Sequence, residues 1–214
     1  MNLESYTTIE CVVFVLLLMG PAYLANTIAV LTGGKYPIDQ EKLYSDGNRI
    51  LGDGKTWSGL IGGTIGGIAF GVLLYFYGIR VILSIIVILE NRDSLFFNDL
   101  EDFADDPNMS PWGESWNMFF IFFLLSFGAL FGDMAASFYK RRQNLQRGDK
   151  FAILDMYDFI FMSLLLCFIF QRDWLLSWIL DGWVPLFTIL FLTPFLHRGV
   201  NIIGYKIGVK NEPW

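Results

Sequence analysis

The sequence has few of the residues that usually carry acid–base, nucleophilic or metal chemistry. It holds one histidine and two cysteines among 214 residues. Cys11 and Cys167 lie in apolar runs without CxxC spacing, so we interpret both as packing residues and not as a disulfide or a metal pair. His197 has no partner motif, and no Ser-His-Asp or Cys-His set is evident. These absences argue against hydrolases that depend on such sets.

Two common sequence signals are also missing. The apolar segment 10–31 has no basic region before it, so we expect no cleavable signal peptide. The run Gly52–Thr56 ends like a Walker A loop, but that motif requires glycine where Arg49 stands. No alternating strand pattern precedes the run, so a standard P-loop fold is excluded.

What the chain does have is apolar sequence: 54% of its residues are hydrophobic and 21 are Phe. A soluble domain of this size rarely has such a composition, so we expect an all-α integral membrane protein with one domain over residues 1–214. A helix needs about 20 mainly apolar residues to cross a bilayer. Five runs qualify as transmembrane helices: 9–31, 58–89, 116–139, 159–178 and 183–203.

The second of these runs is too long for one simple span. Arg80 interrupts it, so either the helix ends near Tyr77 and an interfacial segment follows, or the helix tilts steeply. The same run contains overlapping GxxxG pairs, which let helix backbones approach closely in lipid. These pairs predict helix packing within the chain or a homodimer, and they are formed by Gly62, Gly63, Gly66, Gly67 and Gly71.

Basic residues in the loops predict the orientation of the helices. Lys and Arg mark the cytoplasmic side, and they are concentrated in segments 35–55, 140–150 and 198–210. We therefore expect a multi-pass cell-membrane protein with its N-terminus outside and its C-terminus inside. The acidic loop 90–115 then faces outward, and because it lacks the EF-hand pattern we interpret it as a solvated loop.

The first of two polar islands between the apolar runs is Gly52–Thr56. Glycine backbones can bend so that several N–H groups point at one anion. The following helix start adds partial positive charge, Lys55 adds a full charge and Thr56 adds a hydroxyl. This island, which includes Asp53 and Gly54, therefore predicts a loop that binds phosphates.

The second polar island begins near the end of the third apolar run. Asp133 and Ser137 are four residues apart on one helix face, and Lys140 continues that face. Asp155 and Asp158 share a face at the start of the fourth helix. Three carboxylates from neighbouring helix ends would suit Mg2+, which prefers a few carboxylates, water and phosphate oxygens. The alternative is that the Asp residues cap helices or pair with nearby Arg residues.

The basic cluster Lys140-Arg141-Arg142 and the amide Asn26 each have two interpretations. The cluster either contacts substrate, through Lys140 and Arg141, or serves topology and lipid headgroups. We expect Arg142 to face solvent or lipid phosphate. A buried amide in a membrane helix needs a partner, so Asn26 either bridges helices or faces a polar cavity.

Taken in order, these residues resemble the archaeal CDP-archaeol synthase family. The resemblance covers most of the chain and rests on the motifs Pro21-Ala22-Tyr23 with Asn26, 49–57, Gly132-Asp133-x3-Ser137-x2-Lys140-Arg141-Arg142, and Leu154-Asp155-x2-Asp158. The family is grouped with phosphatidate cytidylyltransferases, which share a Ser-x-x-Lys-Arg element followed by spaced Asp residues. Ser58 departs from the family pattern, which usually has Arg after Trp57.

The resemblance implies a five-helix membrane enzyme that uses CTP and magnesium, with no role for nucleic acid. The implied reaction converts unsaturated archaetidic acid, a diether glycerol phosphate with two geranylgeranyl chains, into CDP-archaeol and diphosphate. The expected catalytic residues are Asp133, Lys140 and Asp158, and the expected magnesium ligands are Asp133, Asp155 and Asp158. The expected substrate-binding residues are Asn26, Asp53, Gly54, Lys55, Thr56, Ser137 and Arg141. The alternative function is a membrane transporter for an anionic solute.

Overall fold

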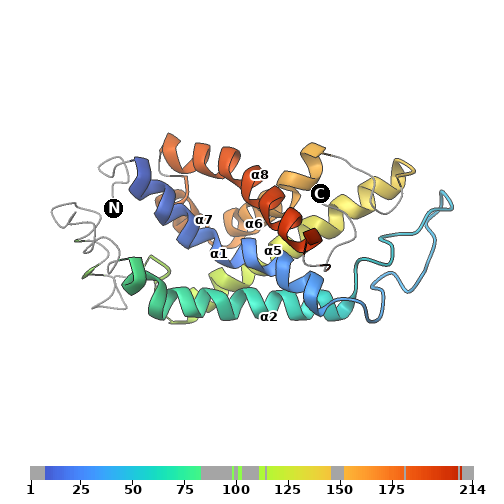
Figure 1. The fold of residues 1–214 in the computed structure, drawn as a ribbon, viewed down its shortest axis with the longest axis horizontal. Coiled ribbons are helices and arrows are strands. Elements are labelled where there is room, and N and C mark those ends of the chain that lie inside the picture. The colour runs from blue at the N-terminus through green and yellow to red at the C-terminus, as the bar shows by residue number, and fades with distance from the viewer. Residues whose placement is uncertain are drawn as a thin grey trace.

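Within the part of the chain that the computed structural model describes, the regular secondary structure is helical apart from two isolated β-bridges, and residues 33–56 form a non-helical loop between the first two helices (Figure 1). The described residues are 8–82, 98, 101–102, 111–113, 115–145, 152–180, 182–206 and 208. The helices are α1 (Thr8–Thr32), α2 (Trp57–Leu73), the π-helical turn η2 (Leu74–Gly78), α5 (Ser115–Arg142), α6 (Ala152–Phe170), α7 (Arg172–Trp178) and α8 (Trp183–Lys206). This confirms an all-α architecture.

Among the described residues, three helices are long and apolar enough to cross a membrane. They cover Ile9–Thr32, Trp57–Ile82 and Trp116–Arg142, and a fourth span is formed if α7 and the segment Trp183–Leu196 count as one. Those two segments are bent by 92° relative to each other. The protein is therefore a membrane protein, while the five-span arrangement remains a prediction.

The second apolar run does not end near Tyr77. The helix continues through Arg80 to Ile82, with the π-helical turn Leu74–Gly78 inserted into it. A π-helical turn accommodates an extra residue without breaking the helix. Of the two alternatives for this run, the helix end near Tyr77 is therefore wrong. The acidic loop expected over residues 90–115 lies almost wholly outside the described residues.

The fourth predicted span, 159–178, is also divided differently. Its helix starts earlier, at Ala152, and ends at Phe170, after which α7 begins at Arg172. The residue between them, Gln171, has a non-helical backbone. The prediction was wrong here because the apolar sequence on both sides was joined into one span across the polar residues Gln171, Arg172 and Asp173, where the helix breaks.

Glycines allow α2 to lie directly against α1 and α5. A methyl group added at Gly63 would be 2.8 Å from the Ala25 carbonyl oxygen of α1, and one at Gly71 would be 2.6 Å from the Phe122 ring of α5. Small residues at this spacing permit close helix packing. The glycine motif therefore packs helices within the chain, one of the two structural roles that the sequence predicted.

Glycines also allow α5 to lie directly against α6. An added methyl at Gly128 would be 2.7 Å from the Ser163 Cα atom, and one at Gly132 would overlap the Asp158 carbonyl group. Ser163 strengthens this contact because its hydroxyl donates a 2.8 Å hydrogen bond to the Leu125 carbonyl. The close approach places Asp133, the residue after Gly132, beside the start of α6.

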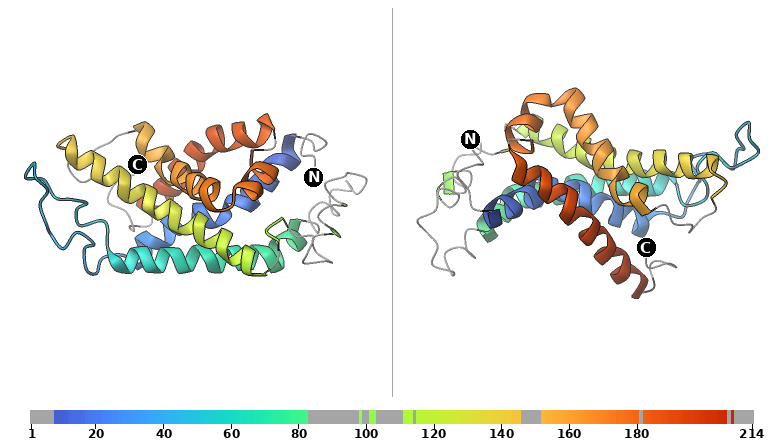
Figure 2. Two further views of the ribbon diagram at one scale, coloured as in Figure 1. Left: turned by 180° about the vertical axis from the view of Figure 1, so that it is seen from behind. Right: turned by 90° about the horizontal axis from the view of Figure 1, so that it is seen from above.

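The core lies among α1, α5, α6 and α7, and it contains both cysteines. Cys11 and Cys167 are both buried in this core, which agrees with their interpretation as packing residues. In Figures 1 and 2, the loop between α1 and α2 lies at the same end of the molecule as the C-terminal end of α5. Both polar islands therefore belong to one end of the helix assembly.

Candidate active site

An ion pair joins the two polar islands. Lys55 Nζ lies 2.5 Å from Asp133 Oδ2, so the glycine-rich loop is in direct contact with α5. The Lys55 side chain is 20% exposed and that of Asp133 is 40% exposed. Both groups are therefore accessible to a ligand that enters from the loop side.

The second island contains a further lysine–aspartate pair. Lys140, in the last turn of α5, lies 2.7 Å from Asp155 in the first turn of α6. Asp158 follows one turn later, and its Oδ1 accepts a hydrogen bond from the Phe159 backbone N–H. Asp158 is also close enough to Asp133, Lys55 and Asp155 for their charges to act on it. The site thus combines three carboxylates with two lysines.

The three carboxylates do not form a ready metal site. Within the described residues, no group of three His, Cys, Asp or Glu side chains converges closely enough to hold a metal ion. Asp133 and Asp155 each point to a lysine instead. The alternative interpretation had named helix caps or Arg residues as the partners, whereas in this structure Asp133 and Asp155 pair with lysines.

Thr56 has a structural role at the start of α2. Its hydroxyl oxygen accepts hydrogen bonds from the backbone N–H groups of Gly59 and Gly34, at 3.2 and 3.3 Å. This is the normal position of an N-cap side chain. Ser58, which stands where the family usually has Arg, accepts a hydrogen bond from the Lys35 backbone N–H at 3.3 Å. Both hydroxyls therefore fix the entry of the loop into α2.

The rest of the glycine-rich loop is open. Asp53 is 65% exposed and lies 2.9 Å from Arg49, and no described residue lies within 4 Å of a methyl group added at Gly54. Gly52 has a φ of +94°, which favours glycine. A methyl group there would also be 3.2 Å from Nε of Arg141. Gly52 therefore lies directly against a guanidinium group of the second island.

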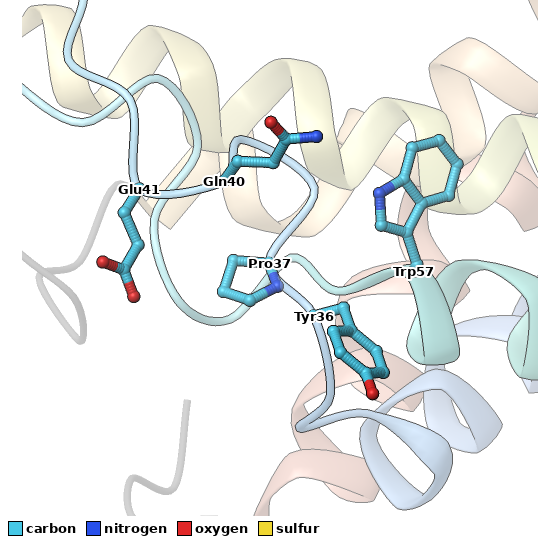
Figure 3. A pocket seen from close by; sticks show the side chains of 5 residues that line it. All are labelled: Tyr36, Pro37, Gln40, Glu41 and Trp57. Atoms are coloured by element: carbon cyan, nitrogen blue, oxygen red, sulfur yellow. The ribbon is translucent and has the colours of Figure 1, made fainter.

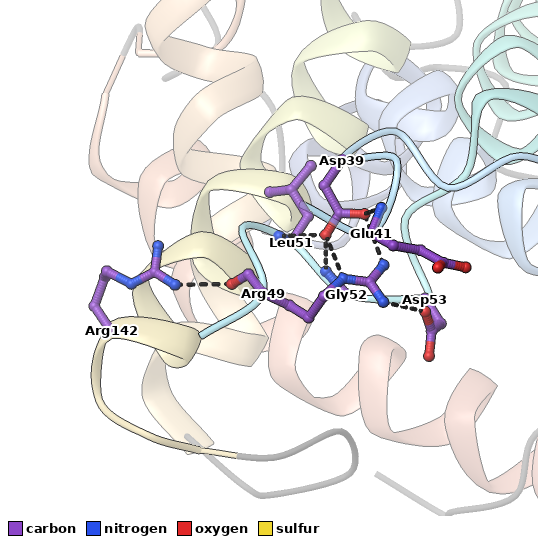
Figure 4. A network of polar contacts seen from close by, with 7 residues as sticks. All are labelled: Asp39, Glu41, Arg49, Leu51, Gly52, Asp53 and Arg142. Atoms are coloured by element: carbon purple, nitrogen blue, oxygen red, sulfur yellow. Dashed lines mark hydrogen bonds and ion pairs between the residues drawn. The ribbon is translucent and has the colours of Figure 1, made fainter. Parts of the chain in front are cut away.

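Asp39, a residue that we did not predict, organises this loop (Figure 4). Its side chain is fully buried and accepts two hydrogen bonds from Arg49, at 2.7 and 3.1 Å. Burial opposes ionisation of Asp39, but the bonds from Arg49 and from the backbone N–H groups of Gly52, Leu51 and Glu41 hold its pKa well below the usual value. The carboxylate therefore stays ionised inside the loop.

Arg142 attaches the same loop to α5. Its guanidinium lies 2.6 Å from Asp46 and donates a 2.8 Å hydrogen bond to the Arg49 carbonyl. It also lies 4.7 Å from the ring centre of Tyr44 and 4.8 Å from that of Phe138, within the range of cation–π contacts. Our expectation that Arg142 faces solvent or lipid phosphate was wrong, because the loop folds back over it.

Asn26 and Ser137 have unused polar groups. The Oδ1 atom of Asn26 is buried and accepts no hydrogen bond from the described residues. The bridge between α1 and α8 is made instead by Tyr23, whose hydroxyl lies 2.9 Å from that of Thr193. Ser137, half-buried one turn after Asp133, likewise has no hydrogen bond to a described residue. Both are thus available to a ligand.

A shallow pocket lies on another side of the loop (Figure 3). It is lined by Tyr36, Pro37, Gln40, Glu41 and Trp57. These five residues include no Lys or Arg, and Glu41 brings negative charge. A polyphosphate would be repelled here, so we place the candidate site at Lys55 and Asp133 and not in this pocket.

Comparisons with known proteins agree with this geometry. The model of the CarS-like family, described as CDP-archaeol synthase, matches residues 8–100 and 93–214. The CDP-archaeol synthase of Methanospirillum hungatei is 40% identical over 197 residues, which cover 92% of this chain and all of that protein. The corresponding protein of Picrophilus torridus is 38% identical, with 95% of this chain and 97% of that protein covered.

The chain belongs to the CDP-archaeol synthase family.

A solved structure supports the same relationship. It is described as an intramembrane enzyme for archaeal membrane lipid biosynthesis, and it matches with a TM-score of 0.56 and 28% identity. The match covers 87% of this chain and 92% of the solved chain. The resemblance to CDP-archaeol synthases inferred from the motifs is therefore confirmed. Asp39, Asp46 and Arg49 were missed because a loop carboxylate or guanidinium gives no sign in the sequence of whether it is buried.

Proposed function

We propose that this protein transfers the cytidylyl group of CTP to unsaturated archaetidic acid and forms CDP-archaeol and diphosphate. The observation that supports this most directly is the contact between Lys55 and Asp133 in a chain of this family. It brings a cationic, glycine-rich loop against carboxylates at the end of apolar helices. A soluble polyphosphate and a bilayer-bound phosphate could meet at such a place.

The reaction needs alignment and charge neutralisation more than a strong base. A lipid phosphate oxygen attacks the α-phosphorus of CTP, a new P–O bond forms, the α–β bridging P–O bond breaks, and diphosphate leaves. The second pKa of a phosphate monoester is near ~6, so the nucleophile is largely ionised at neutral pH. Most of the catalytic effect then comes from positioning and from cations around the phosphates. This fits a site without a His-based catalytic set.

The cationic groups at the site have distinct starting positions. Lys55 and Lys140 are both held by aspartates. A triphosphate carries more negative charge than one carboxylate, so nucleotide binding would draw these lysines toward phosphate oxygens. Arg141 lies against Gly52 and donates a hydrogen bond to the Leu145 carbonyl, which leaves its other N–H donors for CTP or the lipid phosphate. Lys55, Lys140 and Arg141 thus form the proposed phosphate-binding set.

Polar groups around these cations complete the proposed substrate site. Gly54 and Asp53 line the open part of the loop, and Thr56 fixes the start of α2. Ser137 and the Oδ1 atom of Asn26 are available to hydroxyl or amino groups of the nucleotide. A buried acceptor without a partner costs about 1–3 kcal/mol, so a ligand donor at Asn26 would recover that loss.

A magnesium ion fits part of this arrangement. Mg2+ is usually held by one or two carboxylates together with water and phosphate oxygens. Asp133 and Asp158 are close enough for their like charges to act on each other, so a shared cation would stabilise both. Asp155, paired with Lys140 in this structure, is the proposed third ligand. Bound there, the ion would neutralise charge on the phosphates.

We further propose that the site faces the cytoplasm, where CTP is found. The basic residues of the loop and of α5 support this orientation. A homodimer also remains a proposal, although the glycines of α2 that could have formed its face pack against α1 and α5. The transporter alternative is not supported by the comparisons, because the named relatives are synthases.

Purified protein in detergent provides the test. Labelled CTP, magnesium and unsaturated archaetidic acid should give a labelled CDP-lipid and diphosphate in equal amounts. Saturated and ester lipids in parallel would measure chain and linkage preference. Protein that inserts normally but forms no CDP-lipid, while it moves an anionic solute across vesicles without lipid phosphate, would contradict the proposed function.

A further inference from the structure

The loop between α1 and α2 is built around one buried carboxylate. The two carboxylate oxygens of Asp39 together accept five hydrogen bonds. Oδ1 accepts from Arg49 Nη2 and Glu41 N, and Oδ2 accepts from Arg49 Nε, Leu51 N and Gly52 N. The distances run from 2.7 to 3.2 Å. With a fully buried side chain and no lone pair directed outward, Asp39 does not contact a substrate itself.

The hydrogen bonds of Asp39 lead directly to the candidate site. The Gly52 N–H donates to Asp39, while the Gly52 carbonyl accepts a 3.2 Å hydrogen bond from the Lys55 backbone N–H. The turn 52–55 is therefore anchored at its first residue, Gly52, by the hydrogen bond to the Asp39 carboxylate. At its other end, Lys55 reaches Asp133. The position of the lysine depends on where Asp39 holds Gly52.

Gly52 also sets the place of a second cationic group. Its Cα faces the Arg141 guanidinium so closely that an added methyl would lie 3.2 Å from Nε and Nη2. On the opposite side of the network, Arg142 holds the Arg49 carbonyl at 2.8 Å (Figure 4). The buried carboxylate thus fixes, through Gly52 and Arg49, the distance between the loop and the end of α5.

We propose that Asp39 is a positioning residue for CTP: it holds Gly52 so that Lys55 and Arg141 are placed together for the triphosphate before the nucleotide binds. This inference rests on the proposed function. It goes further because it assigns CTP affinity to a residue that the nucleotide never touches. Preorganised charges bind better than charges that must be ordered on binding.

The test compares two variants with a matched control. Asp39→Asn keeps the shape but places an amide N–H against either two or three donors, whichever way it is turned. Arg49→Lys keeps the charge but loses the two-pronged contact with Asp39. Glu41→Gln removes the same charge from an exposed side chain on the same loop and is the control. Each is assayed for KM toward CTP, KM toward the lipid, and kcat, alongside unfolding in detergent.

We expect the KM for CTP to rise about tenfold to a hundredfold in Asp39→Asn and less in Arg49→Lys, because misplacement by about 1 Å can cost about a hundredfold. The KM for the lipid should not change, and Glu41→Gln should match wild type. In apo protein, hydrogen exchange at the Leu51 and Gly52 amides should rise in both variants. A residue that only supports folding would lower the active fraction, and so kcat, without changing the KM for CTP.

Two results would overturn the role of Asp39. One is an unchanged KM for CTP in folded Asp39→Asn, and the other is an unchanged KM in Arg49→Lys if Asp39→Asn does not fold. A wild-type protein that forms no CDP-lipid would instead contradict the proposed function. In that case, hydrogen exchange would still show whether Asp39 orders the loop.

Discussion

Two carboxylates at the same end of the molecule have opposite surroundings. Asp39 accepts hydrogen bonds from an arginine and three backbone N–H groups, and its pKa is held low. Asp158 accepts one from the Phe159 backbone and lies within range of the like charge of Asp133. The first carboxylate is saturated with donors, while the second accepts one hydrogen bond and has two other carboxylates, Asp133 and Asp155, and one lysine, Lys55, near it.

This difference separates structural charge from charge that a ligand can use. A buried, fully satisfied carboxylate gains nothing more from a ligand. A carboxylate beside another carboxylate gains from any added cation. The loop side of the site is therefore preassembled, and the α5–α6 side is completed by what binds there. Four predictions test this contrast.

The largest effect is expected where the surroundings are incomplete. Asp133→Asn and Asp158→Asn should each lower turnover about 10²–10³-fold, because charge stabilisation at the phosphates is lost. The temperature of thermal unfolding should be unchanged or slightly raised in Asp158→Asn, since one of two like charges is gone. It should be slightly lowered in Asp133→Asn, which also loses the ion pair with Lys55. Asp173→Asn, an exposed change on α7, is the control. Full magnesium-dependent turnover in both variants would show that these carboxylates do not hold the cation.

The next effect concerns the packing that places Asp133 beside Asp158. Gly132→Ala would drive a methyl group into the Asp158 carbonyl, so α5 and α6 must separate. We expect a loss of about 1–3 kcal/mol of stability together with lower turnover, measured by unfolding in detergent and by CDP-lipid formation. Gly199→Ala on α8 has no described atom within 4 Å of the added methyl and should stay near wild type. Equal behaviour of the two variants would refute the role of Gly132.

A smaller effect is expected at the clamp between the loop and α5. Arg142→Lys keeps the charge but loses the planar group between Tyr44 and Phe138, and should cost about 1 kcal/mol. Arg172→Lys is matched to it, because Arg172 also lies over a ring, Phe168, but at 5.5 Å and with an exposed side chain. Differential scanning fluorimetry should separate the two. If both variants lose the same stability, the contacts of Arg142 with the loop and α5 do not add stability beyond that of an exposed cation–π contact.

The smallest effect is the pH dependence of the stability contributed by Asp39, which changes only below about pH 4. The folded-state pKa of Asp39 is below the unfolded value near ~3.9. Asp39 therefore contributes its full stabilisation above about pH 4 and loses it as the pH falls toward the folded-state pKa. Unfolding curves of wild type and Asp39→Asn should differ by a constant amount above about pH 5 and converge below pH 4. A gap that widens in acid would show the opposite sign.

Local pattern was enough for residues whose role depends on their own helix. Asp133, Ser137 and Lys140 share one face of α5 because helix geometry places residues four apart together. The buried cysteines and the glycine packing in α2 also followed from sequence. The π-helical turn before Arg80 did not, because it lies in uniformly apolar sequence. The break at Gln171 was missed although the polar residues Arg172 and Asp173 follow it, because the apolar sequence on both sides was taken as one span.

The sequence by itself determined that this is a helical membrane protein of the CDP-archaeol synthase family with two polar islands. Only the tertiary structure decided how those islands divide the work. It buried Asp39 and Arg142, which hold the loop together through ion pairs with Arg49 and Asp46. It also paired Lys55 with Asp133 and Lys140 with Asp155. The physical reason is that burial and pairing are long-range properties: a carboxylate has the same letter in the sequence whether five donors surround it or one.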